Sequence, residues 1–157
     1  MFGLTDPGRL QAAPQAAARC MTVFTQGEGP LVNIDGAVGF APAAVTLGNV
    51  RGLLSSVVTA FEASGSEGQG AQHLTLVHTF VSTDAARPGT LTTQDRAVCA
   101  PAGSDPAVCR VNDALAVVAG TGVFAHATGS LRNHGVIDFT SFTLTFSIRG
   151  RLCGDGL

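Results

Sequence analysis

The segment from residue 142 to residue 149 alternates apolar and polar side chains at every position. One face carries only apolar residues and the other only polar ones: Phe142, Leu144, Phe146 and Ile148 against Thr143, Thr145, Ser147 and Arg149. A period of two residues is that of a β-strand with one packed face and one face toward solvent or an interface. The alternation does not say which face would line the inside of a closed sheet.

Similar segments recur along the whole chain, separated by turns rich in Gly, Pro, Asn and Ser. No helical pattern of 10–15 residues separates them, so parallel βαβ units are excluded. Residues 41–44 interrupt the second segment, residues 50–62 have a helix as the competing interpretation, and residues 123–128 suit one irregular helical turn. The expected strands are residues 20–25, 31–40, 45–62, 72–83, 89–98, 108–119, 130–139 and 141–152. This number predicts an all-β fold, an eight-stranded antiparallel β-barrel with short hairpin connections.

Length and composition set the domain organisation. The 157 residues suffice for one domain, with residues 1–19 as an N-terminal arm, mobile or a short helix, and residues 20–157 as a single barrel. Hydrophobic residues make up 45% and charged residues only 13%, which fills a core and leaves a sparsely charged surface. We therefore expect a homo-oligomer.

Several classes of function are excluded by the residues present. The net charge is −2 and the basic residues are scattered along the sequence, so no nucleic-acid partner is expected. No apolar run reaches the length of a membrane-spanning helix, so no membrane span is expected. The chain has no lysine for a Schiff base and no tyrosine to serve as an acid.

The four cysteines predict a disulfide framework rather than a metal site. Cys99 and Cys109 flank a loop that contains Pro and Gly, and we predict a bond between them. Cys20 and Cys153 lie at the two ends of the folded region and can pair if the terminal strands are neighbours. The alternative is four buried free thiols in a cytosolic protein. The chain as written starts without a signal peptide and reads as cytoplasmic, or as secreted if a leader was removed and the cysteines are paired.

Charged side chains on apolar strands are the first candidates for a site. Asp95 and Arg96 lie on opposite faces of one strand, and Asp113 interrupts another apolar strand. Buried ionic groups are costly unless they are paired. An Asp–Arg pair inside the barrel would hold the structure or orient a polar group of a ligand, with Arg51 and Arg110 as the other possible partners.

His78 is the best-placed candidate for acid–base chemistry at neutral pH, because it stands in mid-strand among Leu and Phe. The structural alternative is a satisfied core histidine. The spacing of the four histidines brings no two of them onto one face with a carboxylate, so no metal is expected. No Ser-His-Asp signature is present, because Ser66 lacks the glycine pattern of a nucleophile elbow.

Residues 120–125, Gly-Thr-Gly-Val-Phe-Ala, imitate a dinucleotide-binding fingerprint after a Val-rich strand, with Asp138 downstream. That fingerprint requires a crossover helix and a parallel strand. Only about ten residues separate Gly122 from the next strand, which is too short for the crossover. We therefore interpret these glycines as a turn with positive φ and expect no cofactor.

Three segments together resemble the allene oxide cyclase / dirigent-like β-barrel superfamily, over roughly residues 70–153. They are Leu91-Thr-Thr-Gln-Asp-Arg-Ala-Val, Ala119-Gly-Thr-Gly-Val-Phe-Ala-His-Ala-Thr-Gly-Ser-Leu and Ile148-Arg-Gly-Arg-Leu-Cys. The resemblance, here to a bacterial member, implies an eight-stranded antiparallel barrel, often trimeric or dimeric, with an apolar cavity open at one end. Plant members cyclise an unstable epoxide or steer radical coupling without a cofactor, and small bacterial barrels of similar shape cyclise polyketide-type substrates.

The sequence therefore favours a cofactor-independent cyclase or isomerase acting on a hydrophobic small molecule, polyketide-, terpenoid- or oxylipin-like, held in the barrel lumen. Arg51 or Arg96 would be the electrophilic donor, and Asp95, Asp113 or His78 the orienting or acid–base group. The alternative is a non-catalytic exported barrel that binds a small molecule or has a structural role. A cavity of a few hundred Å³ with convergent polar groups would favour the enzyme, and a lumen filled by Leu and Phe would favour the structural role.

Overall fold

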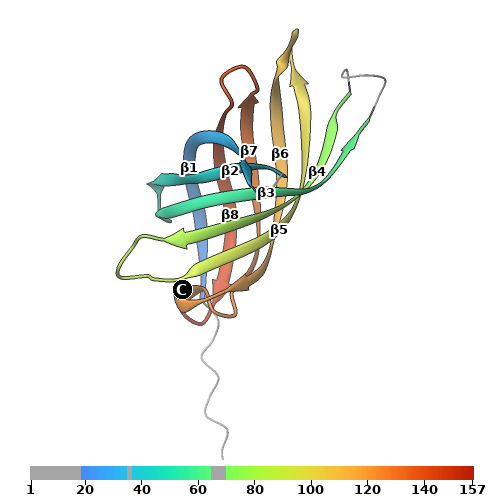
Figure 1. Cartoon of the computed structure of the whole chain (residues 1–157). Coiled ribbons are helices and arrows are strands. Elements are labelled where there is room, and N and C mark those ends of the chain that lie inside the picture. Colours follow the sequence, from blue (N-terminus) through green and yellow to red (C-terminus); the bar gives the residue numbers. More distant parts are fainter. Residues whose placement is uncertain (1–18, 35–36, 65–69) are drawn as a thin grey trace, which may run out of the picture.

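The protein forms a closed antiparallel β-barrel (Figure 1). The computed structural model describes residues 19–34, 37–64 and 70–157. The residues expected to form an N-terminal arm lie outside this range, except for Arg19, which begins the first strand. The strands are β1 (Arg19–Ile34), β2 (Ala37–Gly48), β3 (Gly52–Ala63), β4 (Gln72–Ser82), β5 (Thr90–Ala102), β6 (Asp105–Gly120), β7 (Thr128–Asp138) and β8 (Thr143–Gly154).

Each strand pairs with the next in the sequence, and β8 pairs with β1 to close the barrel. A single 3₁₀ turn, η1 (Gly122–Phe124), lies between β6 and β7 and is the helical turn expected near residues 123–128. None of the helical structure in the described residues reaches the length and apolarity that a membrane crossing demands. The predicted all-β, eight-stranded antiparallel barrel is thereby confirmed.

The boundaries of the first strands differ from the prediction. Residues 31–34 end β1 and residues 37–40 begin β2, so the expected strand 31–40 spans a hairpin. Residues 41–44 do not break β2, because the chain passes them with a shift of register between Phe40 and Ala43. The competing helix at residues 50–62 is wrong, since β3 occupies this segment. Alternation that continues through a tight turn does not reveal where one strand ends and the next begins.

Two local details near the C-terminal half also differ from the prediction. β5 extends to Ala102 and β6 starts at Asp105, so most of the expected loop between Cys99 and Cys109 is strand, and the connection is a tight hairpin turn. Phe142 does not join the apolar face of β8; it precedes the strand with a φ of 53° and is 60% exposed. Gly122 has the expected positive φ of 59°, and a Cβ there would lie 2.2 Å from the Pro88 carbonyl oxygen.

Both disulfides form between strands. Cys20 and Cys153 are direct register partners on β1 and β8, where they link the two ends of the barrel sheet. Cys99 and Cys109 link β5 to β6 with a Cα–Cα distance of 5.5 Å, as predicted. The described cysteines include no free thiol, so the alternative of four free thiols is wrong.

The interior of the barrel has a densely packed end, the closed end, and a hollow end, the open end. Antiparallel succession puts the β2–β3, β4–β5 and β6–β7 connections at one end, where η1 and the C-terminus also lie (Figure 1). Here the apolar core is dense, with Phe80 and Phe124 in edge-to-face contact at a centroid distance of 5.8 Å. The other core side chains at this end include Val23, Leu54, Leu91, Leu115, Leu131 and Ile148. The opposite end, bounded by the β3–β4, β5–β6 and β7–β8 connections, remains hollow.

Candidate functional site

A cavity of about 400 Å³ occupies the open half of the barrel. Its walls are mostly apolar and come from nearly every strand: Leu31, Phe40, Leu74, Leu76, Val111, Ile137 and Leu144. Phe61 and Phe139 lie at the mouth and are both exposed. This volume and lining suit a small hydrophobic molecule.

The floor of the cavity is polar. Ser56, His78, Asp113 and Asn133 line it, and all four are buried. Below this layer the core of the closed end begins, with only a small void of about 40 Å³. A molecule that fills the cavity therefore meets a set of hydrogen-bonding groups at its inner end and apolar walls elsewhere.

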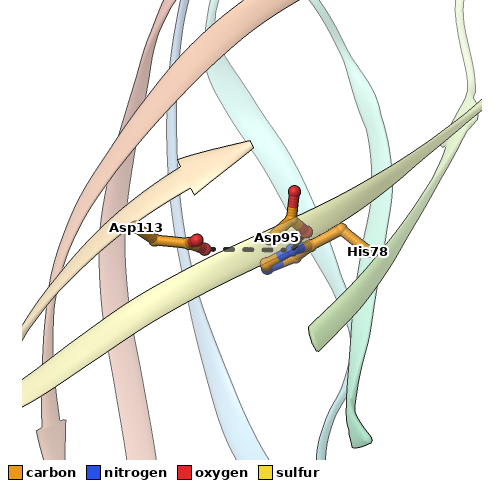
Figure 2. A group of neighbouring side chains, drawn as sticks. All are labelled: His78, Asp95 and Asp113. Carbon is orange, nitrogen blue, oxygen red and sulfur yellow. Dashed lines mark hydrogen bonds and ion pairs between the residues drawn. The ribbon is translucent and has the colours of Figure 1, made fainter. Parts of the chain in front are cut away.

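Strand alternation positions two ionisable residues of the floor, His78 and Asp113, and a third beside them, Asp95. His78 follows Leu76 and precedes Phe80 on the inner face of β4, as the sequence pattern predicted. Asp95 lies on the inner face of β5, and Asp113 on the inner face of β6. Because β4, β5 and β6 are consecutive neighbours in the barrel, the three side chains converge in its interior (Figure 2).

His78 and Asp95 form a tight buried pair. His78 Nδ1 lies 2.5 Å from Asp95 Oδ2, a hydrogen bond in which the imidazole N–H donates to the carboxylate. The hydroxyl of Thr93 donates a second hydrogen bond to the same oxygen at 2.8 Å. Asp113 Oδ2 lies 4.0 Å from His78 Nδ1, so one imidazole faces two carboxyl groups (Figure 2).

In the part of the chain that the structure describes, three side-chain oxygens at the floor and in the buried cluster beside it lack a donor. Asp95 Oδ1, Asp113 Oδ1 and Asn133 Oδ1 are buried and have no hydrogen-bond partner among the described residues. Among the described residues, no arginine lines the cavity. The carboxyl groups of Asp95 and Asp113 face His78 instead. Unpaired buried acceptors are costly, which points to a proton or a donor-bearing ligand as their missing partner.

The pKa of Asp113 is raised from 3.8 to about 6. Burial is the largest cause, because it disfavours the charged form, and the nearby charge of Asp95 raises the pKa further. His78 and the hydrogen bond from the Asn133 amide lower it in part. With a pKa of about 6, Asp113 is protonated in most molecules below pH 6 and in about a tenth of them at pH 7, and the protonated form can act as a donor.

The structure brings together three of the five predicted site residues. His78, Asp95 and Asp113 converge, whereas Arg96 is exposed on the outer face of β5. Arg51 is also exposed and lies between β2 and β3, at the closed end of the barrel. The buried Asp–Arg pair expected from the sequence is therefore replaced by an Asp–His–Asp cluster. Arg110 likewise lies on the outer face, on β6.

Sequence reasoning missed Thr93, Asn133 and Ser56. Thr93 has the same strand parity as Asp95, and Asn133 has the same parity as the core residue Leu131. That parity was a usable signal once the inner face of each strand was known. Asn133 and Asp113 are direct register partners on β7 and β6. Their contact depends on this register, which the sequence pattern does not specify.

The cluster also offers three possible metal-ligand atoms, one from each of His78, Asp95 and Asp113, all within 4.8 Å of one another. The spacing of the histidines in the sequence did not indicate such a group, because only one histidine takes part in it. Two ligands that each lie about 2.0–2.2 Å from one ion stand roughly 3 Å or more apart in tetrahedral or octahedral sites. The 2.5 Å separation of His78 and Asp95 is instead that of a pair sharing a proton.

Comparison with known proteins supports the fold. No protein-family model matches the sequence, and no curated protein sequence matches it. The pterocarpan synthase dirigent protein GePTS1 is similar in structure, with a TM-score of 0.56 at 15% identity, over 98% of this chain and 99% of that one. The pterocarpan synthase dirigent protein PsPTS1 is similar with a TM-score of 0.50 at 15% identity, over 88% and 96% of the two chains. The predicted dirigent-like barrel fold is confirmed by this likeness.

Proposed function

We propose that the barrel is a cofactor-independent cyclase or isomerase that acts on a hydrophobic small molecule bound in its cavity. The observation that carries this proposal is Asp113, a buried carboxyl group with a raised pKa at the floor of an apolar cavity. Strongly perturbed acids in apolar pockets are concentrated at functional sites. The fold shared with dirigent proteins, which include pterocarpan synthases, is consistent with this class of chemistry.

In the proposed mechanism, protonated Asp113 donates a hydrogen bond or a proton to a carbonyl or epoxide oxygen of the ligand. This replaces the role that the sequence analysis assigned to Arg51 or Arg96. His78 accepts a proton from another atom of the ligand, while Asp95 orients the imidazole and stabilises its charged form. One proton added and one removed leave the composition of the ligand unchanged, as an isomerisation requires.

The apolar walls supply the rest of the catalysis in this proposal. They select a folded conformer of a polyketide-, terpenoid- or oxylipin-like substrate and exclude water from the reacting atoms. Because the cavity has one polar end, the oxygen-bearing end of the substrate is placed at His78 and Asp113.

The first test identifies the ligand and then removes the acid. Native mass spectrometry of the purified protein is expected to detect a lipophilic molecule bound in stoichiometric amount. With that ligand class as substrate, Asp113→Asn is expected to lower kcat by about 10²-fold or more, the range of general acid–base catalysis. Asp155→Asn, which neutralises an exposed carboxylate near the C-terminus, is the matched control and should keep full activity.

The alternative is a non-catalytic exported barrel that binds a small molecule. The two disulfides favour export, because such bonds persist in oxidising compartments. The cavity of about 400 Å³ weighs against a purely structural role. Stoichiometric binding without turnover, unchanged in Asp113→Asn, would establish the binding function and reject the enzyme.

A further inference from the structure

Arginines gather on one outer face of the barrel. Five of the eight arginines in the described residues are exposed on the outside of β5 to β8, and we call them the arginine face: Arg96, Arg110, Arg132, Arg149 and Arg151. They are scattered along the sequence, and the chain as a whole has a net charge of −2. The concentration of positive charge is therefore a product of the fold.

Strand register aligns several of these residues in one row. Arg96 is the partner of Ala114, which is the partner of Arg132, which is the partner of Arg149. With strands about 4.8 Å apart, the row from Arg96 to Arg149 spans roughly 14 Å. Arg132 and Arg149 stand directly opposite each other, an arrangement that is unfavourable for like charges.

The orientation of Arg149 is fixed by an aromatic ring. Its guanidinium carbon lies 4.8 Å from the centroid of Phe24, its register partner on β1. Stacking on a ring leaves the N–H groups at the edge of the guanidinium free to bind an anion. The side chain is thus held in position before any ligand arrives.

Among the described residues, no acidic side chain forms an ion pair with the arginine face. The ion pairs found among the described residues join Arg87 to Asp84 and His78 to the two buried aspartates, away from this face. The outward-facing acids nearest to it are Glu28 on β1 and Asp138 at the end of β7. Asp138 is engaged with the backbone N–H groups of Thr140 and Ser141. Within the described residues, the arginine face is therefore left without an ion-pair partner, and an external anion could supply one.

A polar groove of about 740 Å³ borders the row. It runs over β1, β8, β7 and β6, and its lining on β7 and β8 starts two residues from Arg132 and Arg149 and ends four residues from them. Its lining offers polar groups from Gln26, Glu28, Arg110, Asn112, His134, Thr145 and Ser147. Together these groups donate and accept hydrogen bonds, as sugar hydroxyls require, with Arg110 only donating and Glu28 as the one carboxyl group of the lining.

We propose that the arginine face and its groove bind an acidic polysaccharide, a chain of sugars that carry carboxylates. The carboxylates would pair with Arg96, Arg132 and Arg149, since the guanidinium fork matches a carboxylate in a bidentate way. The sugar hydroxyls would bind in the groove. The disulfides suit an oxidising compartment outside the cell, where such polymers are found and nucleic acids are not the common polyanion.

A second copy of the chain fits this face poorly. An isologous contact would place arginines against arginines across the interface, which costs free energy unless an anion lies between them. The proposal also does not depend on the cavity, because the arginine face and the cavity floor lie on opposite sides of the barrel wall.

The test uses the full chain and a charged oligosaccharide with a neutral counterpart. Binding of oligogalacturonate and of its fully methyl-esterified form is measured by calorimetry at low and high ionic strength. The double variant Arg132→Gln/Arg149→Gln is compared with Arg19→Gln/Arg51→Gln, which removes the same charge from exposed sites away from this face. Melting temperature and binding of a cavity ligand verify that both variants are folded.

The wild-type protein and the control variant are expected to bind the acid form and not the ester, with weaker binding at high salt. The test variant should bind at least about tenfold more weakly, which corresponds to about 1.4 kcal/mol. Equal losses in both variants would overturn the proposal, and so would absence of binding to the acid form. Tighter binding to a DNA oligonucleotide or to phosphatidylserine vesicles would overturn it in favour of those partners.

Discussion

Individual hydrogen bonds hold part of the buried cluster of His78, Asp95 and Asp113 in place. Asp95 accepts from both His78 and Thr93, so its orientation is fixed by two hydrogen bonds. Asp113 is bound less firmly, since its Oδ1 atom has no partner among the described residues. At the residue scale, Asp113 is therefore the member of the cluster whose charge is least compensated. A buried carboxyl group with little compensation seldom stabilises a fold, and its replacement by a neutral residue often increases stability.

Protonation of Asp113 links stability to pH. Its pKa is raised from 3.8 to about 6 in the folded protein, so between these values the folded state binds more protons than the unfolded state. The contribution of protonated Asp113 to the free energy of unfolding is therefore fully present below about pH 4 and is lost as the pH rises through about 6. A rise of about two units corresponds to roughly 3 kcal/mol.

We predict that Asp113→Asn is more stable than the wild-type protein at pH 8, by up to roughly 3 kcal/mol, and that the difference vanishes below about pH 4. Chemical denaturation of both proteins between pH 3.5 and pH 8 measures the difference directly. A difference that is constant over this range, or one that grows toward acid pH, would contradict the assignment. Asp155→Asn again serves as the exposed control.

At the scale of elements, the two disulfides close loops of very different length. Cys20 and Cys153, which are 133 residues apart in sequence, join β1 to β8 and so close a loop of nearly the whole chain. Cys99–Cys109 joins the arms of a hairpin across only 10 residues. In the chain-entropy model, the stabilisation grows with the logarithm of the loop length.

Removal of the two bonds should therefore have unequal effects. We expect Cys20→Ser/Cys153→Ser to lower the free energy of unfolding by about 5 kcal/mol, and Cys99→Ser/Cys109→Ser by about 3 kcal/mol. Urea unfolding without reductant compares both double variants with the wild-type protein. A larger loss for the hairpin bond would show that local strain or packing at β5–β6, rather than loop closure, governs the stability.

At the scale of the whole molecule, the outer surface divides into faces of different character. The outside of β5 to β8 carries the arginine face, whereas the facing outer positions of β3 and β4 carry no charge: Leu53, Ser55, Val57, Val77, Thr79 and Val81. Leu53 and Val81 are register partners and are 40% and 43% exposed. Depletion of charge together with exposed apolar side chains is typical of the centre of a protein–protein interface.

We predict that this neutral face of β3 and β4 joins copies of the chain into a dimer or a trimer. Leu53→Arg should convert the oligomer to monomers, because it would bury a charge at the centre of the contact. Light scattering at micromolar concentration measures the mass. Val118→Arg, which places the same charge at a 56% exposed position on β6, should leave the oligomer intact. A monomeric wild-type protein would rule the interface out.

Much of the architecture was accessible from the sequence, because strand alternation is a local property. The apolar face of β8 and the placement of His78 on the same face as Leu76 and Phe80 follow from side chains two residues apart. The placement of Asp95 and Arg96 on opposite faces follows in the same way. The first two hairpins were the exceptions, because alternation passes through a turn without a break, and the expected strands 31–40 and 45–62 each span such a turn. The sequence also named both cysteine pairs, the second on condition that the terminal strands are neighbours.

Which strand faces lie inside, and which side chains meet there, depends on closure of the barrel. Alternation defines two faces of each strand, but only a closed sheet makes one of them an interior, so Arg51 and Arg96 could be placed in the lumen before the fold was known. The convergence of His78, Asp95 and Asp113 and the row of arginines both depend on the register between strands. Register and closure are set by contacts among residues far apart in sequence, which pack the closed end and leave the open end hollow. The pattern of each strand alone carries no information about those contacts.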